Sequence, residues 1–217
     1  MALFGKKPVS RQDRLAAAGK ARAEGRTSKA VSEYRKALAD RPDDPTTHAK
    51  LAPLLAKTGD YPSAWGSFVA AGERFFEQGF VDKALSNYLQ ATRAMPWHPK
   101  AWKAAARMML DKGRRADAYR LVLEGRDHLR RRSQRPEAIE LLTVAAQIDD
   151  SDFEVMIDLA RLLRKVGRTE DATIVLERLA KLHEGSRLKR VRREYLSLGQ
   201  SAKTAWAWLV GKKTTGR

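Results

Sequence analysis

Six alanines recur along the chain at intervals of 34, 20, 34, 20 and 34 residues. They are Ala30, Ala64, Ala84, Ala118, Ala138 and Ala172. The two intervals together give a repeat of 54 residues. A repeat of this size predicts an architecture in which each unit packs only on its neighbours. Function is then expected on an extended surface and not in a single catalytic pocket.

The 54-residue repeat holds at positions other than alanine. It pairs Gly25 with Gly79, Tyr34 with Tyr88 and Pro42 with Pro96. It also runs in threes through Leu51, Ala105, Leu159, through Ala52, Ala106, Ala160, and through Gly59, Gly113, Gly167. Because small, large and glycine positions align together, the repeat reflects structure and not chance.

Each repeat has the sequence pattern of helices, because apolar or small residues recur three and four positions apart. We predict ten helices, over about 11–24, 27–40, 45–58, 62–78, 81–95, 99–112, 115–132, 134–148, 152–166 and 169–182. A basic helix over 186–198 and a short one over 201–210 follow.

Helix ends carry recognisable signals. Asp44 before Pro45 is typical of an N-terminal cap, and Ser151 with Glu154 predicts a capping box. Glycines after three helices, at positions 59, 113 and 167, predict left-handed C-terminal caps. Pro53 lies inside the third helix and should kink it or shift its start.

Several copies of this pattern resemble the tetratricopeptide repeat. The resemblance covers about residues 11–182 and is carried by segments such as Asp44 to Phe68, Gly25 to Pro42, Gly79 to Pro96 and Phe153 to Ala172. It implies an all-α, right-handed α-solenoid of stacked antiparallel helices. It also implies a protein-binding scaffold in which the first helix of each pair lines a concave groove.

The 20-residue spacing departs from that family, because it accommodates one helix and a turn instead of a pair. We infer three helices in each 54 residues, with the helices over 62–78 and 115–132 each shared between two repeats. The alternative is an ordinary helix pair with an inserted helix.

The net charge of +17 is concentrated at the two ends. Residues 1–14 carry +3, residues 185–217 carry +8, and the repeats between them carry +6. We therefore divide the chain into a basic N-terminal segment (1–10), a repeat domain (11–184) and a basic C-terminal part (185–217). Basic ends favour an acidic partner or act as solubilising tails.

The C-terminal part has two features. Leu188, Val191, Tyr195 and Leu198 form one helical stripe, which predicts either a capping helix that closes the repeat stack or an amphipathic helix on a membrane or nucleic acid. Trp206 and Trp208 stand beside lysines and suit an interfacial anchor, a docking peptide or packing on the preceding helix. The candidate interacting residues here are Arg187, Lys189, Arg190, Arg192, Arg193, Trp206 and Trp208.

Helical phase predicts a basic groove for an acidic or extended partner segment, because arginine forms forked hydrogen bonds with carboxylates. On the helix over 152–166, the predicted groove side includes Ile157. The candidate groove residues are Lys100, Lys103, Arg107, Arg120, Arg130, Arg131, Arg161, Arg164 and Lys165. The alternative is an ordinary solvated helix face.

The sequence predicts no enzyme, cofactor or metal site. The four histidines are scattered and lack the spacing of metal ligands, and the chain has no cysteine. No phosphate-binding loop or nucleophile elbow is present.

No apolar run is long enough to span a membrane, and the N-terminus lacks a secretory core. We therefore expect a cytoplasmic protein, or one bound at the inner membrane surface. The leading hypothesis is a scaffold or adaptor within a larger assembly. The alternatives are a nucleic-acid or ribonucleoprotein binder and a peripheral membrane protein, and self-association through apolar ends is a further option.

Overall fold

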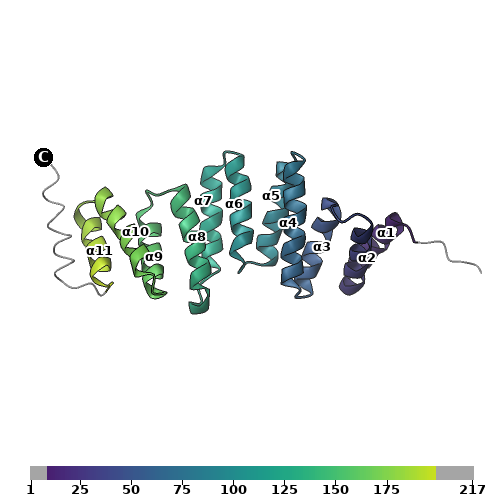
Figure 1. The fold of residues 1–217 in the computed structure, drawn as a ribbon, viewed down its shortest axis with the longest axis horizontal. Coiled ribbons are helices and arrows are strands. Elements are labelled where there is room, and N and C mark those ends of the chain that lie inside the picture. Colours follow the sequence, from purple (N-terminus) through teal and green to yellow (C-terminus); the bar gives the residue numbers. More distant parts are fainter. Residues whose placement is uncertain (1–8, 199–217) are drawn as a thin grey trace, which may run out of the picture. The chain divides into compact units, whose positions relative to one another are not determined.

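The computed structural model describes residues 9–198, and every regular element in that range is a helix (Figure 1). The chain divides into two compact units between Arg114 and Arg115. The first unit holds α1 (Arg11–Ala23), α2 (Thr27–Asp40), α3 (Pro45–Lys57), α4 (Tyr61–Glu77), α5 (Val81–Ala94) and α6 (Pro99–Asp111). The second holds α7 (Arg115–Asp127), the 3-10 helix η1 (Arg132–Gln134), α8 (Arg135–Ile148), α9 (Phe153–Lys165), α10 (Thr169–Leu182) and α11 (Gly185–Leu196).

The helices keep the 54-residue register of the sequence. Helices α3, α6 and α9 begin at Pro45, Pro99 and Phe153, and each has 13 residues. Helices α2, α5 and α8 begin at the same 54-residue interval, and each has 14 residues. Within each unit, consecutive helices pack on one another as the stacked helices of an α-solenoid do.

One contact recurs in this register although its chemistry changes. In each copy, a side chain reaches the N-cap residue of the helix two further along. The three contacts are Arg11 with Asp44 at 2.5 Å, Trp65 with His98 at 4.9 Å between ring centroids, and Tyr119 with Asp152 at 2.8 Å. The backbone therefore brings these positions together, and each repeat fills the contact with its own pair of residues.

The predicted end signals are confirmed at Asp44 and at three glycines. The Asp44 carboxylate accepts a hydrogen bond from the Thr47 N–H, and Pro45 begins α3. Gly59, Gly113 and Gly167 have φ values of 84°, 71° and 82°, in the left-handed region that favours glycine. Helix α3 runs through Pro53 without a shift of its start.

The predicted capping box at Ser151 is wrong. Asp152 is the N-cap of α9, and its carboxylate accepts hydrogen bonds from the backbone N–H groups of Glu154 and Val155. The N–H and hydroxyl of Ser151 instead donate to the Asp149 carboxylate. These hydrogen bonds lower the pKa of Asp149. The carboxylate of Asp152 therefore caps α9 in place of the predicted Ser151 hydroxyl.

The helix predicted over 115–132 is also shorter than expected, because α7 ends at Asp127. A tight turn follows, in which the Leu129 N–H donates to the Arg126 carbonyl and the Leu129 side chain becomes buried. Arg130 Nε donates to the Asp127 carbonyl at 3.0 Å. An arginine thus satisfies one of the free carbonyl groups at the helix end.

Small residues let the helices of each unit approach closely. In the first unit, α4 packs on both α3 and α5, as a shared helix requires. Its Ala64, Phe68 and Ala71 are fully buried. The core of the second unit joins α9 and α10 to α11, with buried residues that include Met156, Leu176, Leu179 and Val191.

Candidate partner-binding site

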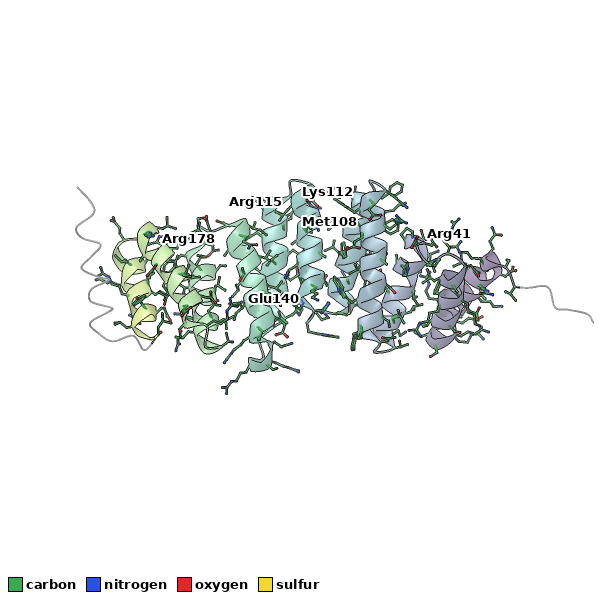
Figure 2. The ribbon with its side chains drawn as sticks, in the orientation of Figure 1. Arg41, Met108, Lys112, Arg115, Glu140 and Arg178 are labelled. Atoms are coloured by element: carbon green, nitrogen blue, oxygen red, sulfur yellow. The ribbon has the colours of Figure 1, made fainter. Side chains whose placement is uncertain are left out.

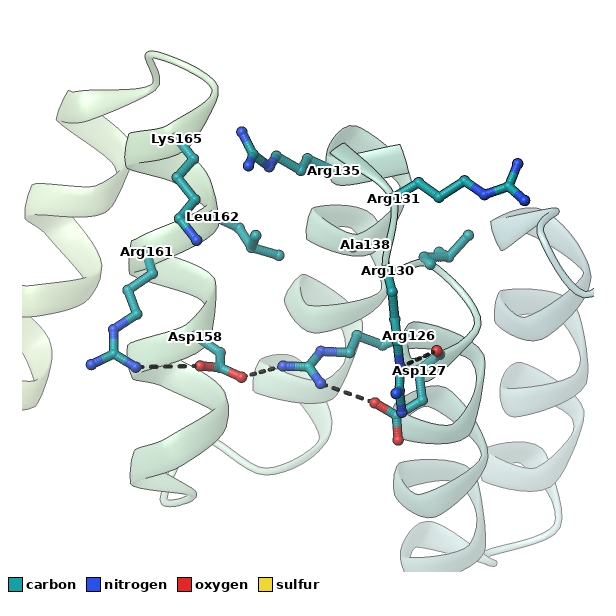
Figure 3. A pocket seen from close by; sticks show the side chains of 11 residues that line it. Arg126, Asp127, Arg130, Arg131, Arg135, Ala138, Asp158, Arg161, Leu162 and Lys165 are labelled. Carbon is teal, nitrogen blue, oxygen red and sulfur yellow. Dashed lines mark hydrogen bonds and ion pairs between the residues drawn. The ribbon is translucent and has the colours of Figure 1, made fainter. Parts of the chain in front are cut away.

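A pocket of about 410 Å³ in the second unit gathers basic side chains from α7, the α7–α8 connection, α8 and α9. We call it the basic pocket, and Figure 3 shows it from close by. Its lining residues are Arg126, Asp127, Leu129, Arg130, Arg131, Arg135, Ala138, Asp158, Arg161, Leu162 and Lys165. Six of these side chains are cationic and two are carboxylates, so the lining carries a net charge of +4.

Ion pairs fix two of the six cations. The Asp158 carboxylate lies between the guanidinium groups of Arg126 and Arg161, and it pairs with Arg161 at 3.8 Å (Figure 3). Arg126 also pairs with Asp127 at 2.9 Å. These contacts hold α7 and α9 together across the pocket, and they neutralise part of its charge.

The other four cations have no carboxylate partner among residues 9–198. They are Arg130, Arg131, Arg135 and Lys165. Arg131 points away from the ion pairs around Asp158, whereas Arg135 and Lys165 extend from α8 and α9 (Figure 3). Figure 2 shows the side chains along both units as sticks. Uncompensated cations that share one pocket attract anions, and three of these four are arginines, which form forked hydrogen bonds with carboxylates.

The structure brings together four of the nine groove residues named from the sequence. Arg130, Arg131, Arg161 and Lys165 line the basic pocket. Lys100, Lys103 and Arg107 lie on α6 in the first unit. Arg120 forms an ion pair with Asp117 on its own helix, and Arg164 lies on α9 outside the lining of the basic pocket.

The predicted groove side of α9 is wrong at one position. Ile157 is fully buried in the core of the second unit. The neighbouring Asp158 faces the pocket instead. Asp158, Arg126 and Arg135 were not among the predicted groove residues. Asp158 and Arg126 lie 54 residues after Ala104 and Gly72, which line a pocket of the first unit.

That register connects the basic pocket to a second one, of about 310 Å³, in the first unit. We call it the aromatic pocket, and its lining is Trp65, Val69, Gly72, Glu73, Phe76, Glu77, Tyr88, Ala104, Arg107 and Met108. Seven of its positions lie 54 residues before lining positions of the basic pocket. These are Gly72 with Arg126, Glu73 with Asp127, Phe76 with Arg130, Glu77 with Arg131, Ala104 with Asp158, Arg107 with Arg161 and Met108 with Leu162.

Two copies of one structural pocket have therefore diverged in chemistry. Arg130 in the basic pocket occupies the place of Phe76, and Arg126 the place of Gly72. In the aromatic pocket, burial raises the pKa of Tyr88 to about 12. The same fold presents a basic surface in one unit and an aromatic one in the other.

The apolar stripe of α11 packs on the second unit. Val191 and Tyr195 are buried against α9 and α10, and Leu188 and Leu198 border the same core. Arg190 forms a bidentate ion pair with Glu154, with Nη1 2.5 Å from Oε1 and Nη2 2.8 Å from Oε2. This packing is what a capping helix requires.

The candidate basic side chains of α11 are in part engaged within the unit. Besides the Arg190–Glu154 pair, Arg187 and Arg190 lie over the Phe153 ring, at 5.5 and 5.4 Å from its centroid. Lys189 and Arg193 are exposed and Arg192 is half-buried. Trp206 and Trp208 lie outside the described residues.

Two further properties concern residues 9–198 alone. No three His, Cys, Asp or Glu side chains in this range are grouped to hold a metal ion. None of the helices described there has the length and apolar character needed to cross a membrane.

Comparisons with known proteins point to one family. Residues 129–195 match the family model described as tetratricopeptide repeat. No curated protein matches the chain.

Similar solved structures include a tetratricopeptide repeat protein from Parabacteroides merdae ATCC 43184, which is 13% identical, with 92% of this chain and 97% of that one covered and a TM-score of 0.29. The pilF protein of Pseudomonas aeruginosa is 20% identical, with coverages of 87% and 96% and a TM-score of 0.28. A thermophilic TPR protein from Thermus thermophilus is 19% identical, with coverages of 87% and 98% and a TM-score of 0.27.

The matched segment spans the α7–α8 connection, α8, α9, α10 and most of α11, and so includes most of the lining of the basic pocket. Its helices carry the left-handed glycine cap at Gly167 and the buried alanine at Ala172 that recur through the chain. Proteins built from this repeat are in general scaffolds for protein–protein interaction and typically not enzymes. Residues 129–195 are therefore similar to tetratricopeptide repeats, and the recurring helices and glycine caps extend the same pattern through both units.

Proposed function

We propose that this protein is a non-enzymatic scaffold that holds an acidic segment of a protein partner in the basic pocket, as part of a larger assembly. The observation that carries the proposal is the set of four cations without a carboxylate partner among the described residues, Arg130, Arg131, Arg135 and Lys165. A segment rich in Asp or Glu supplies the missing anions, and a pocket of about 410 Å³ holds a few side chains of such a segment.

The lining favours a peptide over a nucleic acid. Single-stranded nucleic acids bind where bases stack on aromatic side chains, and no aromatic residue lines the basic pocket in the described part of the chain. The apolar lining consists of Leu129, Ala138 and Leu162, which suit aliphatic side chains of a peptide.

Fluorescence anisotropy with a fluorescein-labelled polyglutamate peptide tests this proposal. Arg135→Glu and Lys165→Glu in the full chain should each weaken binding about tenfold, because each places a like charge beside the bound carboxylates. Affinity should also fall as the salt concentration rises.

Lys100→Glu is the matched control, because it makes the same change in net charge as Lys165→Glu on an exposed side chain of the first unit. It should alter affinity by less than about twofold. Equal losses in all three variants would mean that overall charge, and not the pocket, binds the peptide. Tighter binding of a labelled oligouridylate, or of anionic vesicles, with the same loss in the pocket variants would overturn the choice of an acidic protein segment.

A further inference from the structure

Helix α4 presents apolar residues at positions where other copies of the repeat carry arginine. These residues lie on one face of the helix, four or seven positions apart, and are Tyr61, Trp65, Val69 and Phe76. In the 54-residue register, Tyr61 is equivalent to Arg115, and Phe76 is equivalent to Arg22 and Arg130. Tyr61 and Phe76 are both exposed. Because the repeat accommodates arginine at these positions, the aromatic residues are not required for the fold, and their exposure points to a ligand.

This face of α4 forms one wall of the aromatic pocket. Trp65 and Phe76 line the pocket from α4, Tyr88 lines it from α5, and Met108 lines it from α6. The rings of Trp65 and Tyr88 lie against each other, with their centroids 6.4 Å apart. A pocket of about 310 Å³ with such a lining accommodates one large aromatic side chain.

The pocket also contains a carboxylate that is free to pair with a ligand. No ion pair engages Glu73 within residues 9–198, whereas Glu77 pairs with Arg74 at 3.0 Å. Burial is the main cause of the raised pKa of Tyr88, and the charge of Glu73 raises it further, by more than the charge of Arg107 lowers it. The charge of Glu73 therefore dominates beside the Tyr88 ring and favours a cation there.

We propose that the aromatic pocket binds a segment of a protein partner in which one aromatic residue is flanked by lysine or arginine. The aromatic ring of the segment packs against Trp65, Phe76 and Met108, and the adjacent cation pairs with Glu73. Together with the basic pocket, this site lets the protein hold two segments of opposite charge. The inference does not rest on the proposed function, because it uses residues of the first unit alone.

Fluorescence anisotropy with the full chain and a fluorescein-labelled peptide, Gly-Ser-Lys-Lys-Trp-Lys-Lys-Ser-Gly, tests the proposal. A protein of net charge +17 repels a basic peptide in general, so binding indicates a specific site. Replacing the tryptophan of the peptide with alanine should weaken binding at least about tenfold, and replacing its lysines with serine should weaken binding about threefold.

Two variants of the protein locate the site. Phe76→Arg introduces the residue that other copies carry and should weaken binding about tenfold, because the apolar wall is lost. Leu110→Arg is its control, because Leu110 is also 37% exposed but does not line the pocket. Glu73→Lys should likewise weaken binding about tenfold. Its control is Glu170→Lys, which makes the same change in charge on an exposed side chain of the second unit. Each control should alter affinity by less than about twofold.

The proposal is overturned if the tryptophan peptide does not bind below about 1 mM, or if the alanine peptide binds equally well. It is also overturned if Phe76→Arg and Glu73→Lys, shown to be folded by circular dichroism, bind as the unaltered protein or lose no more affinity than their controls. Tighter binding of vesicles of phosphatidylcholine and phosphatidylserine, lost in Phe76→Arg but not in Leu110→Arg, would assign this face of α4 to a membrane and not to a protein segment.

The same variants separate this proposal from the proposed function. Neither Phe76→Arg nor Glu73→Lys alters a residue of the basic pocket, so both should retain polyglutamate binding. Conversely, Arg135→Glu and Lys165→Glu should retain binding of the tryptophan peptide. Failure of one proposal is therefore distinguishable from failure of the other.

Discussion

Arg161 donates two hydrogen bonds to one carboxylate oxygen of Glu194, from Nε at 2.9 Å and from Nη2 at 2.6 Å. Arg161 lies on α9 and lines the basic pocket, whereas Glu194 lies on α11. The hydrogen bonds from Arg161 to Glu194 raise the pKa of the guanidinium above its ordinary value. Helix α11 therefore orients one cation of the pocket and neutralises part of its charge.

Glu194→Gln should strengthen the binding of an acidic peptide. The substitution removes a negative charge beside Arg161, and the attraction of that guanidinium for a bound carboxylate increases. We expect affinity for polyglutamate to rise about threefold, with a stability loss of no more than about 1 kcal/mol because the pair is partly exposed. Anisotropy and urea unfolding measure the two effects. Glu170→Gln is the control, because Glu170 is exposed on α10, and it should change neither the affinity nor the stability. Unchanged affinity in Glu194→Gln would show that Arg161 does not contact the peptide.

The fold could be predicted from the sequence because the 54-residue repeat constrains every helix at once. An error at one helix end was limited by the equivalent ends in the other copies. The two wrong predictions of helix ends, after Asp127 and at Ser151, lie where the copies of the repeat differ in sequence. The chain after Asp127 enters a turn with buried Leu129, and Asp152 takes a cap that the spacing of Ser151 and Glu154 had assigned elsewhere. Periodicity resolves neither the burial of a single leucine in a turn nor the choice between two neighbouring cap residues.

The site was only partly predictable for a related reason. Helical phase located Arg161 and Lys165 on one side of α9, but it could not show that Ile157 turns into the core beside α11. The predicted groove also included residues of α6, which belongs to the other compact unit. Arg126 is equivalent to Gly72 in the 54-residue register, but only the structure shows that Gly72 lines a pocket.

Val191→Ala should destabilise the second unit by about 2 kcal/mol. Val191 lies on α11 and is fully buried against α9 and α10, so truncation of its side chain to alanine leaves a cavity. Urea unfolding monitored by circular dichroism measures the change. Leu196→Ala on the same helix is the control, because Leu196 is 52% exposed and its truncation should cost no more than about 0.5 kcal/mol. Equal effects would mean that α11 does not cap the unit.

The Asp44 cap should make the first unit sensitive to acid. Burial acts to raise the pKa of Asp44, but hydrogen bonds from Thr47 and the charge of Arg11 outweigh it and lower the pKa below 3.8. A carboxyl group whose pKa is lower in the folded state stabilises the protein above its unfolded pKa. That stabilisation is lost as the pH falls through the folded-state value.

Asp44→Ala should therefore cost about 1 kcal/mol at pH 7 and less near pH 3. Urea unfolding at both pH values measures the difference. Asp43→Ala provides the comparison. The Asp43 side chain is 78% exposed and pairs only with Arg74 among the described residues, at 3.3 Å. It should therefore contribute no more than about 0.5 kcal/mol to stability at either pH. A cost for Asp44→Ala that is the same at pH 7 and pH 3 would contradict an ionised cap.

Replacing either of two glycines on α4 with alanine should change the free energy of unfolding, in opposite directions at the two positions. A Cβ atom at Gly72 would lie 2.3 Å from the Tyr88 ring, which is itself buried, so Gly72→Ala should destabilise the first unit by about 1–3 kcal/mol. A Cβ at Gly66 meets no atom within 4 Å, and Gly66→Ala should stabilise the helix by about 0.5–1 kcal/mol. Urea unfolding measures both changes. Stabilisation by both substitutions would mean that the Tyr88 ring moves aside freely. The wall of the aromatic pocket that Tyr88 forms would then be adaptable and not fixed by the close approach of α4 and α5.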